Sequence, residues 1–340
     1  MSLPSSLPSP SLSPALPPAR RVFIRSSAAL GACCLAAPLF AQSFPERAIT
    51  LVVPAPAGGT ADITARMLAE PLSKALGQTV VVDNKGGAAG AVGAQAVINA
   101  RPDGHSYLVA FSGFHTMSPH LIKLPYDPMK DLAPVANVLT APQVLVVRGT
   151  LPFQTAGELI SYAKAKPGKL NYASAGNGSV QHIAAELMKQ ITGTFMLHIP
   201  YRGTGPMLQD LIAGQVDLML TTAPPLIGHI ASGRIRALLV ASDKRLESLP
   251  TVPTAAEAGI KGLDVSSWFA LYTHANAPRT AIDRVSAEVK KIMATPEFQK
   301  KASEQGAQPV YMNPDEMGRY ARVEFDKWGK LIKSAKITAD

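Results

Sequence analysis

Cysteine is nearly absent from this sequence. Its 340 residues include only two cysteines, Cys33 and Cys34, which are adjacent and lie near the N-terminus. Two neighbouring cysteines do not supply the spacing of a disulfide framework or of a thiolate zinc site. We therefore expect no structural disulfide, and no cysteine at all in the mature chain if the N-terminal segment is removed.

Charged residues are also sparse, at 17% of the chain, whereas hydrophobic residues make up 47%. This balance excludes a disordered chain and supplies a sizeable core. The chain has 33 basic and 24 acidic residues, or 30 and 24 without the three arginines of residues 1–41, so the net charge falls from +9 to +6. Because the basic residues are scattered and aromatics are few, we expect no nucleic-acid partner and favour a small anionic ligand.

The fingerprints of common enzyme classes are incomplete. The order strand, Gly58-Gly59, helix, strand and Asp83 imitates a dinucleotide-binding unit. Residues 176–178 (GNG) also begin like its glycine fingerprint, but Gln181 stands where the third glycine is needed. The stretch around Ser174 lacks the first glycine of a serine hydrolase elbow. We predict no enzyme, with no catalytic residue, metal or cofactor; the alternative is an exported Rossmann-like enzyme that uses a nucleotide cofactor.

The N-terminal segment, residues 1–41, has the pattern of an export signal. A basic cluster at 20–25 (RRVFIR) precedes an apolar run at 28–40, which is too short for a comfortable membrane span. The arginine pair followed by apolar residues resembles a twin-arginine signal. We expect cleavage after Ala41 and a mature protein in the periplasm.

A second interpretation of this segment remains open. Residues 30–33 (LGAC) fit a lipoprotein cleavage box, which would leave a lipidated Cys33 at the membrane surface. The apolar stretch before Cys33 is short, so we prefer the interpretation as the apolar core of a signal peptide.

Strand and helix patterns alternate along the rest of the chain, which predicts a parallel α/β sheet. A proline-rich connection, containing Pro119, Pro125, Pro128 and Pro134, separates two such series. No low-complexity linker lies between them, so we expect two lobes joined by crossing strands. We expect strands at 49–53, 79–83, 107–111, 143–147, 170–173, 196–199 and 216–220, and helices at 61–76, 91–100, 155–165, 180–191, 206–212 and around 285–292.

Two glycine-rich turns connect a strand to a helix, at residues 54–60 (PAPAGGT) and 174–179 (SAGNGS). We name them the first and second glycine loops. A helix start leaves backbone N–H groups unpaired at the positive end of the helix dipole, so each loop suits a carboxylate or phosphate. We expect Gly59 and Gly178 to permit close backbone approach or positive φ. The alternative for either loop is a tight turn without a ligand.

The residues of several segments are recognisable as a set. They are residues 54–62 (PAPAGGTAD), 83–85 (DNK), 101–104 (RPDG), 124–128 (LPYDP), 166–179 (KPGKLNYASAGNGS), 200–203 (PYRG), 214–219 (GQVDLM), 249–254 (LPTVPT) and 257–259 (EAG). Together they closely resemble the Bug family, the extracytoplasmic solute receptors of tripartite tricarboxylate transporters. The resemblance covers nearly all of residues 44–340.

This resemblance implies a type II periplasmic-binding-protein fold, with two α/β lobes, a ligand cleft between them and a hinge of crossing strands near 143–147 and 267–273. It implies a first lobe from 42–143 and 267–340 and a second lobe from 144–266. The implied partners are a small organic acid and the membrane subunits of a transporter or a sensing system, with the receptor itself a monomer.

The loops and the resemblance together predict a set of ligand-binding residues. His115 and His182 are expected to form hydrogen bonds rather than to bind a metal, since no partner ligands complete a site. The full predicted set is Ala57, Gly58, Gly59, Thr60, Ser112, Gly113, His115, Ser174, Ala175, Gly176, Asn177, Gly178, Ser179, His182, Tyr201, Gly203, Asp217 and Thr222.

Overall fold

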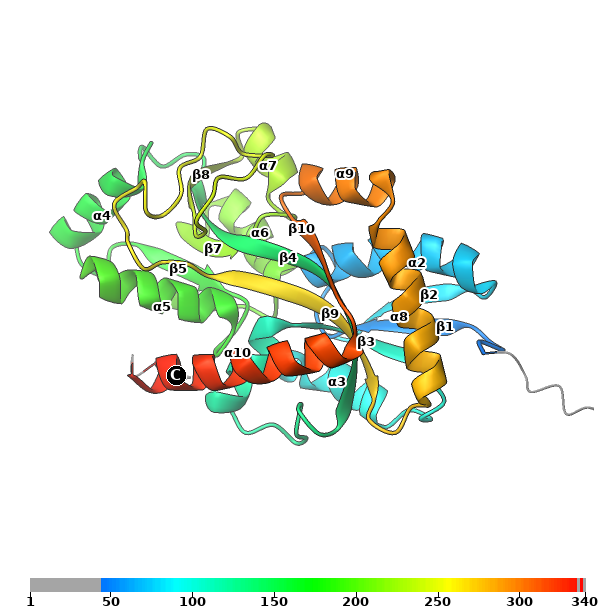
Figure 1. Ribbon diagram of the computed structural model, residues 1–340. Helices are drawn as coiled ribbons and strands as arrows, with labels where there is room; N and C mark the ends of the chain where they lie inside the picture. The colour runs from blue at the N-terminus through cyan, green and yellow to red at the C-terminus, as the bar shows by residue number, and fades with distance from the viewer. Residues whose placement is uncertain (1–43, 335–336, 339–340) are drawn as a thin grey trace, which may run out of the picture. The chain divides into compact units, whose positions relative to one another are not determined.

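A central sheet of ten strands organises the protein (Figure 1). The computed structural model describes residues 44–334 and 337–338, which belong to one compact unit. The predicted export signal, its cleavage site and the alternative lipidation box lie outside these described residues. Among the described helices, none is long and apolar enough to cross a membrane.

The sheet contains two groups of parallel strands. The first group is β1 (Ile49–Val53), β2 (Val80–Asn84) and β3 (Ser106–Phe111), and the second is β5 (Asn171–Ser174), β6 (Leu197–Pro200) and β7 (Leu218–Thr222). We call the parts of the protein built on these groups the first and second lobes. The remaining strands are β4 (Leu132–Arg148), β8 (Ile235–Val240), β9 (Ser266–His274) and β10 (Gln308–Met312).

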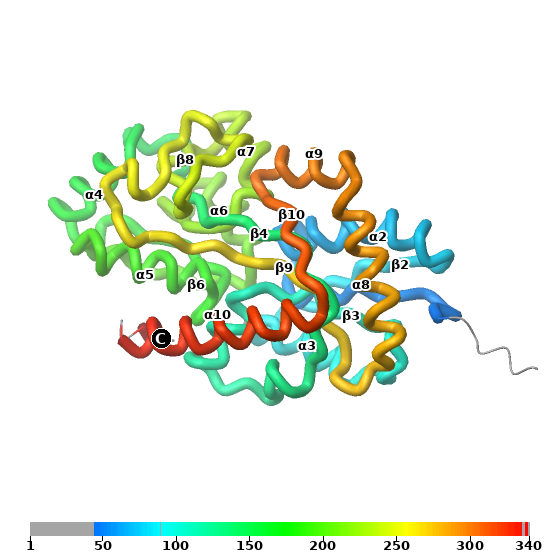
Figure 2. Tube along the Cα trace, viewed as in Figure 1, coloured from blue at the N-terminus to red at the C-terminus, as the bar shows by residue number. Residues whose placement is uncertain are grey.

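These remaining strands are antiparallel to their neighbours, so the predicted parallel pairing is found only within the two groups. The long strand β4 pairs with β9 along residues 132–142 and with β7 along residues 143–147. A single strand therefore runs from one lobe into the other, and β9 lies beside it (Figure 2).

The start of β4 differs from the prediction, which placed a strand only at 143–147. The strand begins at Leu132 and includes Pro134, which was assigned to the proline-rich connection. A register shift between Pro134 and Ala136 accompanies it. Proline has no N–H to donate to a sheet and is tolerated at such irregularities, which is why it did not end the strand.

Helices cover both faces of the sheet, and the expected helices all form, with ends shifted by a few residues. Pro71 lies inside one of them, α2, and Gly77 ends that helix in the left-handed conformation. The helical segments are α2 (Thr60–Leu76), η1 (Ala88–Gly90), α3 (Ala91–Ile98), η2 (Gly113–Met117), η3 (Ser118–His120), α4 (Ala156–Ala165), α5 (Val180–Thr192), α6 (Thr204–Ala213), α7 (Ile227–Ala231), α8 (Arg279–Met293), α9 (Pro296–Glu304) and α10 (Pro314–Ser334).

The C-terminal helix α10 contributes to the core of both lobes. Its residues Met317 and Ala321 are buried in a cluster with strands β3 and β9 of the first lobe. Its residues Trp328 and Ile332 are buried in a cluster with β5 and α5 of the second lobe. Figure 1 shows α10 lying across the region between the lobes, so the helix is a third connection beside β4 and β9.

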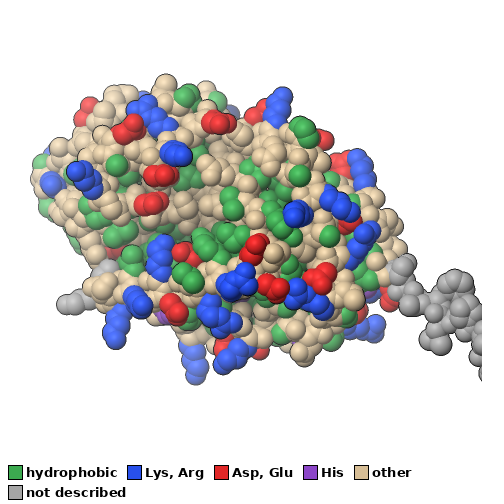
Figure 3. Space-filling view, viewed as in Figure 1, with side chains coloured by type: hydrophobic (Ala, Val, Ile, Leu, Met, Phe, Trp, Pro, Cys, Tyr) green, Lys and Arg blue, Asp and Glu red, His purple; other side chains and the backbone are tan. Residues whose placement is uncertain are grey.

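Basic and acidic side chains are interspersed on the face shown in Figure 3. This agrees with the scattered charge of the sequence and gives that face no patch of one sign.

Candidate ligand-binding cavity

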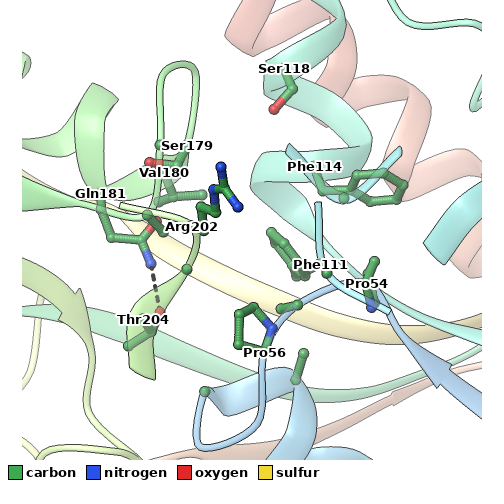
Figure 4. A pocket seen from close by; sticks show the side chains of 18 of the residues that line it. Pro54, Pro56, Phe111, Phe114, Ser118, Ser179, Val180, Gln181, Arg202 and Thr204 are labelled. Atoms are coloured by element: carbon green, nitrogen blue, oxygen red, sulfur yellow. Dashed lines mark hydrogen bonds between the residues drawn. The ribbon is translucent and has the colours of Figure 1, made fainter. Parts of the chain in front are cut away.

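A cavity of about 820 Å³ lies between the two lobes (Figure 4). It lies at the carboxyl ends of parallel strands of both lobes, where ligands bind in open α/β sheets. Its volume is within the range of roughly 300–1,000 Å³ that is usual for small-molecule sites. The lining residues are Pro54, Ala55, Pro56, Gly59, Thr60, Ala61, Gly86, Gly87, Ala88, Gly90, Phe111, Phe114, Ser118, Ile122, Ala175, Gly176, Asn177, Ser179, Val180, Gln181, Tyr201, Arg202, Gly203, Thr204, Thr222, Ser267 and Phe269.

Three helices begin at this cavity. Helix α2 follows Gly59 and helix α6 follows Gly203, and within the described chain no side chain caps either start. Helix α5 follows Ser179, whose hydroxyl accepts a hydrogen bond from the N–H of His182 at 3.2 Å. The first-turn N–H groups of α2 and α6 therefore stay available, and three helix dipoles present their positive ends to one space.

The charge of the lining has one sign. Among the described residues that line the cavity, Arg202 is the only one with a charged side chain, and none is Asp or Glu. Arg202 is exposed and forms no ion pair with a described residue. Figure 4 shows its guanidinium group extending from the second lobe into the cavity. The field in the cavity therefore favours a negatively charged ligand.

The first glycine loop is supported by one carboxylate. Asp62, in the first turn of α2, accepts a hydrogen bond from the N–H of Gly58 at 3.0 Å and pairs with Arg66 at 3.1 Å. Burial acts to raise the pKa of Asp62, but the hydrogen bonds from Arg66 and Gly58 outweigh it and hold the pKa below its ordinary value. The carboxylate is thus charged and engaged with its own loop.

The second glycine loop is supported by its own hydroxyls and by two imidazoles. The hydroxyl of Ser174 accepts a hydrogen bond from the N–H of Gly176 at 3.1 Å and lies 2.6 Å from Nε2 of His198. Nδ1 of His182 accepts from the N–H of Gly178 at 3.3 Å. The rings of His182 and His198 are stacked, with centroids 4.4 Å apart.

The first glycine loop touches the second lobe directly. The hydroxyls of Thr60 and Thr222 lie 2.6 Å apart in a buried hydrogen bond. A Cβ atom on Gly205 would lie 2.7 Å from the carbonyl oxygen of Ala57, and one on Gly203 would lie 2.7 Å from the ring of Pro56. No larger side chain fits at either glycine without a shift, so the lobes are in close contact here.

A second contact between the lobes lies beside the second glycine loop. The Ser118 hydroxyl donates to the carbonyl oxygen of Gly178 at 3.2 Å. A Cβ atom on Gly113 would lie 2.5 Å from the side chain of Val180. The segment that contains Ser118 is tied to α10 as well, because Nε2 of His120 lies 2.9 Å from the carbonyl oxygen of Phe325.

His115 occupies the short π-helix η2. It is fully buried against the rings of Tyr272 and Trp268, at centroid distances of 4.2 and 5.8 Å. This burial lowers its pKa to about 3, so the imidazole is neutral at physiological pH. It does not line the cavity, although its neighbour Phe114 does.

The predicted site residues divide into three groups. Asp217 is not at the cavity, because it pairs with Arg148 at 3.1 Å and accepts from the N–H of Asn171, at the opposite end of β5. The residues that line the cavity are Gly59, Thr60, Ala175, Gly176, Asn177, Ser179, Tyr201, Gly203 and Thr222. Those that lie next to lining residues without lining the cavity are Ala57, Gly58, Ser112, Gly113, His115, Ser174, Gly178 and His182.

Several lining residues were absent from the prediction. Arg202 lies in the PYRG segment between two predicted residues, and its charge was a signal in the sequence that the prediction did not use. Gln181 and Thr204 lie in the first turns of α5 and α6. The rings of Phe111 and Phe269 come from strands far apart in the sequence, and no local pattern marks them.

Known proteins resemble this chain in sequence and in fold. A family model described as the tripartite tricarboxylate transporter family receptor matches residues 64–337. The periplasmic binding protein BugD is 36% identical, with a TM-score of 0.83 over 87% of this chain and 99% of that chain. A protein of R. palustris solved with adipate is 35% identical, with a TM-score of 0.84 over 87% and 99% of the two chains. MatC from Rhodopseudomonas palustris, solved with bound malate, is 31% identical, with a TM-score of 0.80 over 85% and 100%.

Proposed function

Because the chain belongs to the tripartite tricarboxylate transporter receptor family, a family of periplasmic solute-binding receptors, we propose that it captures a small organic carboxylate in the cavity between its lobes. The two-lobe fold is the one expected from the sequence. Membership of a receptor family does not favour the alternative of a nucleotide-dependent enzyme.

The charge of the cavity carries this proposal. Its described lining offers one guanidinium group, from Arg202, and no carboxylate. The starts of α2, α5 and α6 add backbone N–H groups, and the hydroxyls of Thr60 and Thr222 lie beside them. Helix starts bind carboxylates in this way without a metal or a second protein charge. Two structural neighbours were solved with adipate and with bound malate, both of them carboxylates, which supports the same class of ligand here.

We also propose the lining residues of the predicted set as the ligand site, and lobe boundaries near 143–144 and 266–267. The change of β4 partners between Pro142 and Gln143 supports the first boundary. In this proposal the lobes close on the ligand, and the strands β4 and β9 together with α10 form the connection around which they move.

The remaining parts of the proposal concern the cell. We propose that residues 1–41 direct export to the periplasm, and that the mature receptor is a monomer that presents its closed form to the membrane subunits of a transporter or a sensing system. Peptide sequencing of the exported protein would identify the N-terminus, and residue 42 is the expected first residue.

The test of the proposed function is a binding screen with the mature chain. A ligand that binds only the folded state raises the melting temperature by mass action. Mono-, di- and tricarboxylates should raise it, and amides of the same acids should not, because they lack the charge. If no carboxylate raises the melting temperature, or if the amides act equally well, the proposal is wrong.

A further inference from the structure

One wall of the cavity is built from aromatic rings. Phe111 ends β3, Phe114 lies in η2 and Phe269 lies in β9. The ring of Phe111 is central, with centroids 5.8 Å from Phe114 and 6.4 Å from Phe269. Phe114 and Phe269 are buried, whereas Phe111 is only partly buried. A partly exposed ring in a cavity, held in place by two buried rings, offers a rigid apolar face to a ligand.

The opposite wall carries the charge. Arg202 lies across the cavity from Phe111 and Phe114 (Figure 4). Its neighbour Tyr201 donates its hydroxyl proton to Asp210 at 2.7 Å, so its polar group is already engaged. The remaining aliphatic lining comes from Pro54, Ala55, Pro56, Ala61, Ala88, Ile122, Ala175 and Val180.

The lining also lacks a partner for a positive group on the ligand. No Asp or Glu of the described chain lines the cavity, and Asp62, in the first turn of α2, is engaged with Arg66 and Gly58. A buried ammonium group without a counter-charge is costly. Amino acids would therefore bind worse than the same acids without the amino group.

We propose that the ligand is an aromatic carboxylic acid without an ammonium group, whose ring packs on Phe111 while its carboxylate faces the helix starts and Arg202. This inference rests on the proposed function, because it names the class of carboxylate that the same cavity selects. Phe111 and Arg202 are then the residues that determine specificity.

Matched pairs of acids test the proposal by calorimetry on the mature chain. Phenylpropionate should bind about threefold or more tightly than cyclohexylpropionate, which has the same carboxylate and a saturated ring. It should bind at least about tenfold more tightly than phenylalanine, which adds only the ammonium group. Adipate and malate serve as aliphatic references and should bind more weakly than phenylpropionate.

Two variants test whether Phe111 and Arg202 cause these differences in affinity. Phe111→Leu keeps an apolar side chain but removes the ring, so affinity for phenylpropionate should fall about threefold to tenfold while adipate changes less than about twofold. Phe195→Leu is the control, since Phe195 is exposed outside the cavity. Arg202→Gln should weaken every carboxylate by about tenfold or more, and Arg234→Gln makes the same change of charge on an exposed residue outside the cavity.

The outcomes separate this inference from the proposed function. If adipate or malate binds more tightly than every aromatic acid, or if cyclohexylpropionate matches phenylpropionate, the aromatic ligand is wrong and the carboxylate receptor stands. If phenylalanine binds as tightly as phenylpropionate, the exclusion of ammonium groups is wrong. If no acid binds, both proposals fail. A melting temperature for each variant near that of the parent shows that the protein remains folded.

Discussion

The two glycine loops have similar sequences and begin helices on opposite sides of the same cavity, but they are held in different ways. The second loop is held mainly by side chains of its own lobe, Ser174, Ser179 and His182, and Ser118 of the first lobe adds one hydrogen bond to the carbonyl oxygen of Gly178. The first loop has no side-chain cap from the described residues at its helix start, and Asp62 secures only the N–H of Gly58. Asn84 of the same lobe donates to the carbonyl oxygen of Ala55 at 3.2 Å, and contacts with Gly203, Gly205 and Thr222 of the second lobe hold Pro56, Ala57 and Thr60.

This difference indicates how binding and closure are coupled. Because the hydrogen bonds of Ser174, Ser179 and His182 do not depend on the other lobe, the second loop is the more preorganised half of the site. The first loop adopts its described geometry together with a contact that exists only when the lobes are close. In the proposed closure, approach of the lobes completes the site, and a ligand that binds both loops shifts the population toward the closed form.

The largest expected effect comes from separating the first glycine loop from helix α6 of the second lobe. Gly205→Ala places a Cβ atom 2.7 Å from the carbonyl oxygen of Ala57, a backbone atom of the other lobe. The overpacking affects only the closed form, so carboxylate affinity should weaken by about 1–3 kcal/mol. Small-angle scattering should show less compaction at saturating ligand than in the parent.

The control for this variant is Gly228→Ala. Gly228 lies in α7, and a Cβ atom there would have no neighbour within 4 Å. Its affinity and compaction should match those of the parent. Unchanged carboxylate affinity in Gly205→Ala would show that the first loop binds the ligand without its close contact with the second lobe.

Much of this arrangement could be predicted from the sequence, because it is local. The strand and helix periods locate both loops, and glycine with the serine cap marks the start of α5. Of the two reasons expected for a glycine at 59, close approach or positive φ, the second does not apply: Gly59 is extended, and its neighbour Gly58 has a φ of 86°. Gly178 has the expected positive φ of 75°.

Contacts between distant segments could not be predicted. The hydrogen bond between Thr60 and Thr222 joins residues 162 positions apart, and no local pattern specifies it. The full length of β4 was not predicted, because a proline such as Pro134 usually interrupts a strand. Asp217 was predicted in the site because it belongs to the recognisable segment 214–219, but its hydrogen bonds hold it at the other end of the strands.

The next largest expected effect is a difference between the surroundings of the two loops in how the free energy of unfolding responds to acid. The second loop rests on η2, where burial lowers the pKa of His115 to about 3 from an ordinary 6.5. Below pH 6.5 the unfolded chain binds a proton that the folded protein excludes, so this histidine lowers the free energy of unfolding by about 2 kcal/mol between pH 7 and pH 5. Asp62, whose pKa is lowered, stays charged over the same range and gives the first loop no such response.

Urea unfolding at several pH values measures this effect. The loss of stability between pH 7 and pH 5 should be smaller in His115→Leu than in the parent by about 2 kcal/mol, whatever the cost of the substitution itself at pH 7. Between pH 7 and pH 8.5 the difference between the two proteins should be constant. An equal acid response in both proteins would mean that His115 titrates normally.

Removing the cap of the second loop should have a smaller effect. Ser179→Ala deletes the hydroxyl that accepts from the N–H of His182, which should lower the free energy of unfolding by about 1 kcal/mol. Gly59→Ser makes the reverse change at the first loop, where the extended backbone suits a capping serine and the nearest atom is 3.6 Å from the new Cβ. It should gain a few tenths of a kcal/mol. If Ser179→Ala does not lower the free energy of unfolding, or if Gly59→Ser does not raise it, the caps do not distinguish the two loops.

The last prediction concerns the hydrogen bond that joins the first loop to the second lobe. Thr222→Val keeps the shape of the side chain but removes the hydroxyl that lies 2.6 Å from that of Thr60. A buried hydrogen bond contributes about 0.5–1.5 kcal/mol, so carboxylate affinity should fall by about that amount if the bond forms on closure.

Both threonines line the cavity, so a direct contact with the ligand would give the same loss in a single variant. The double variant Thr60→Val, Thr222→Val separates the two cases. If the hydroxyls act through each other, the double variant should bind about as well as either single variant, and the coupling free energy should be close to the single loss. Losses that simply add would mean that each hydroxyl contacts the ligand separately and that the bond does not couple the first loop to the second lobe.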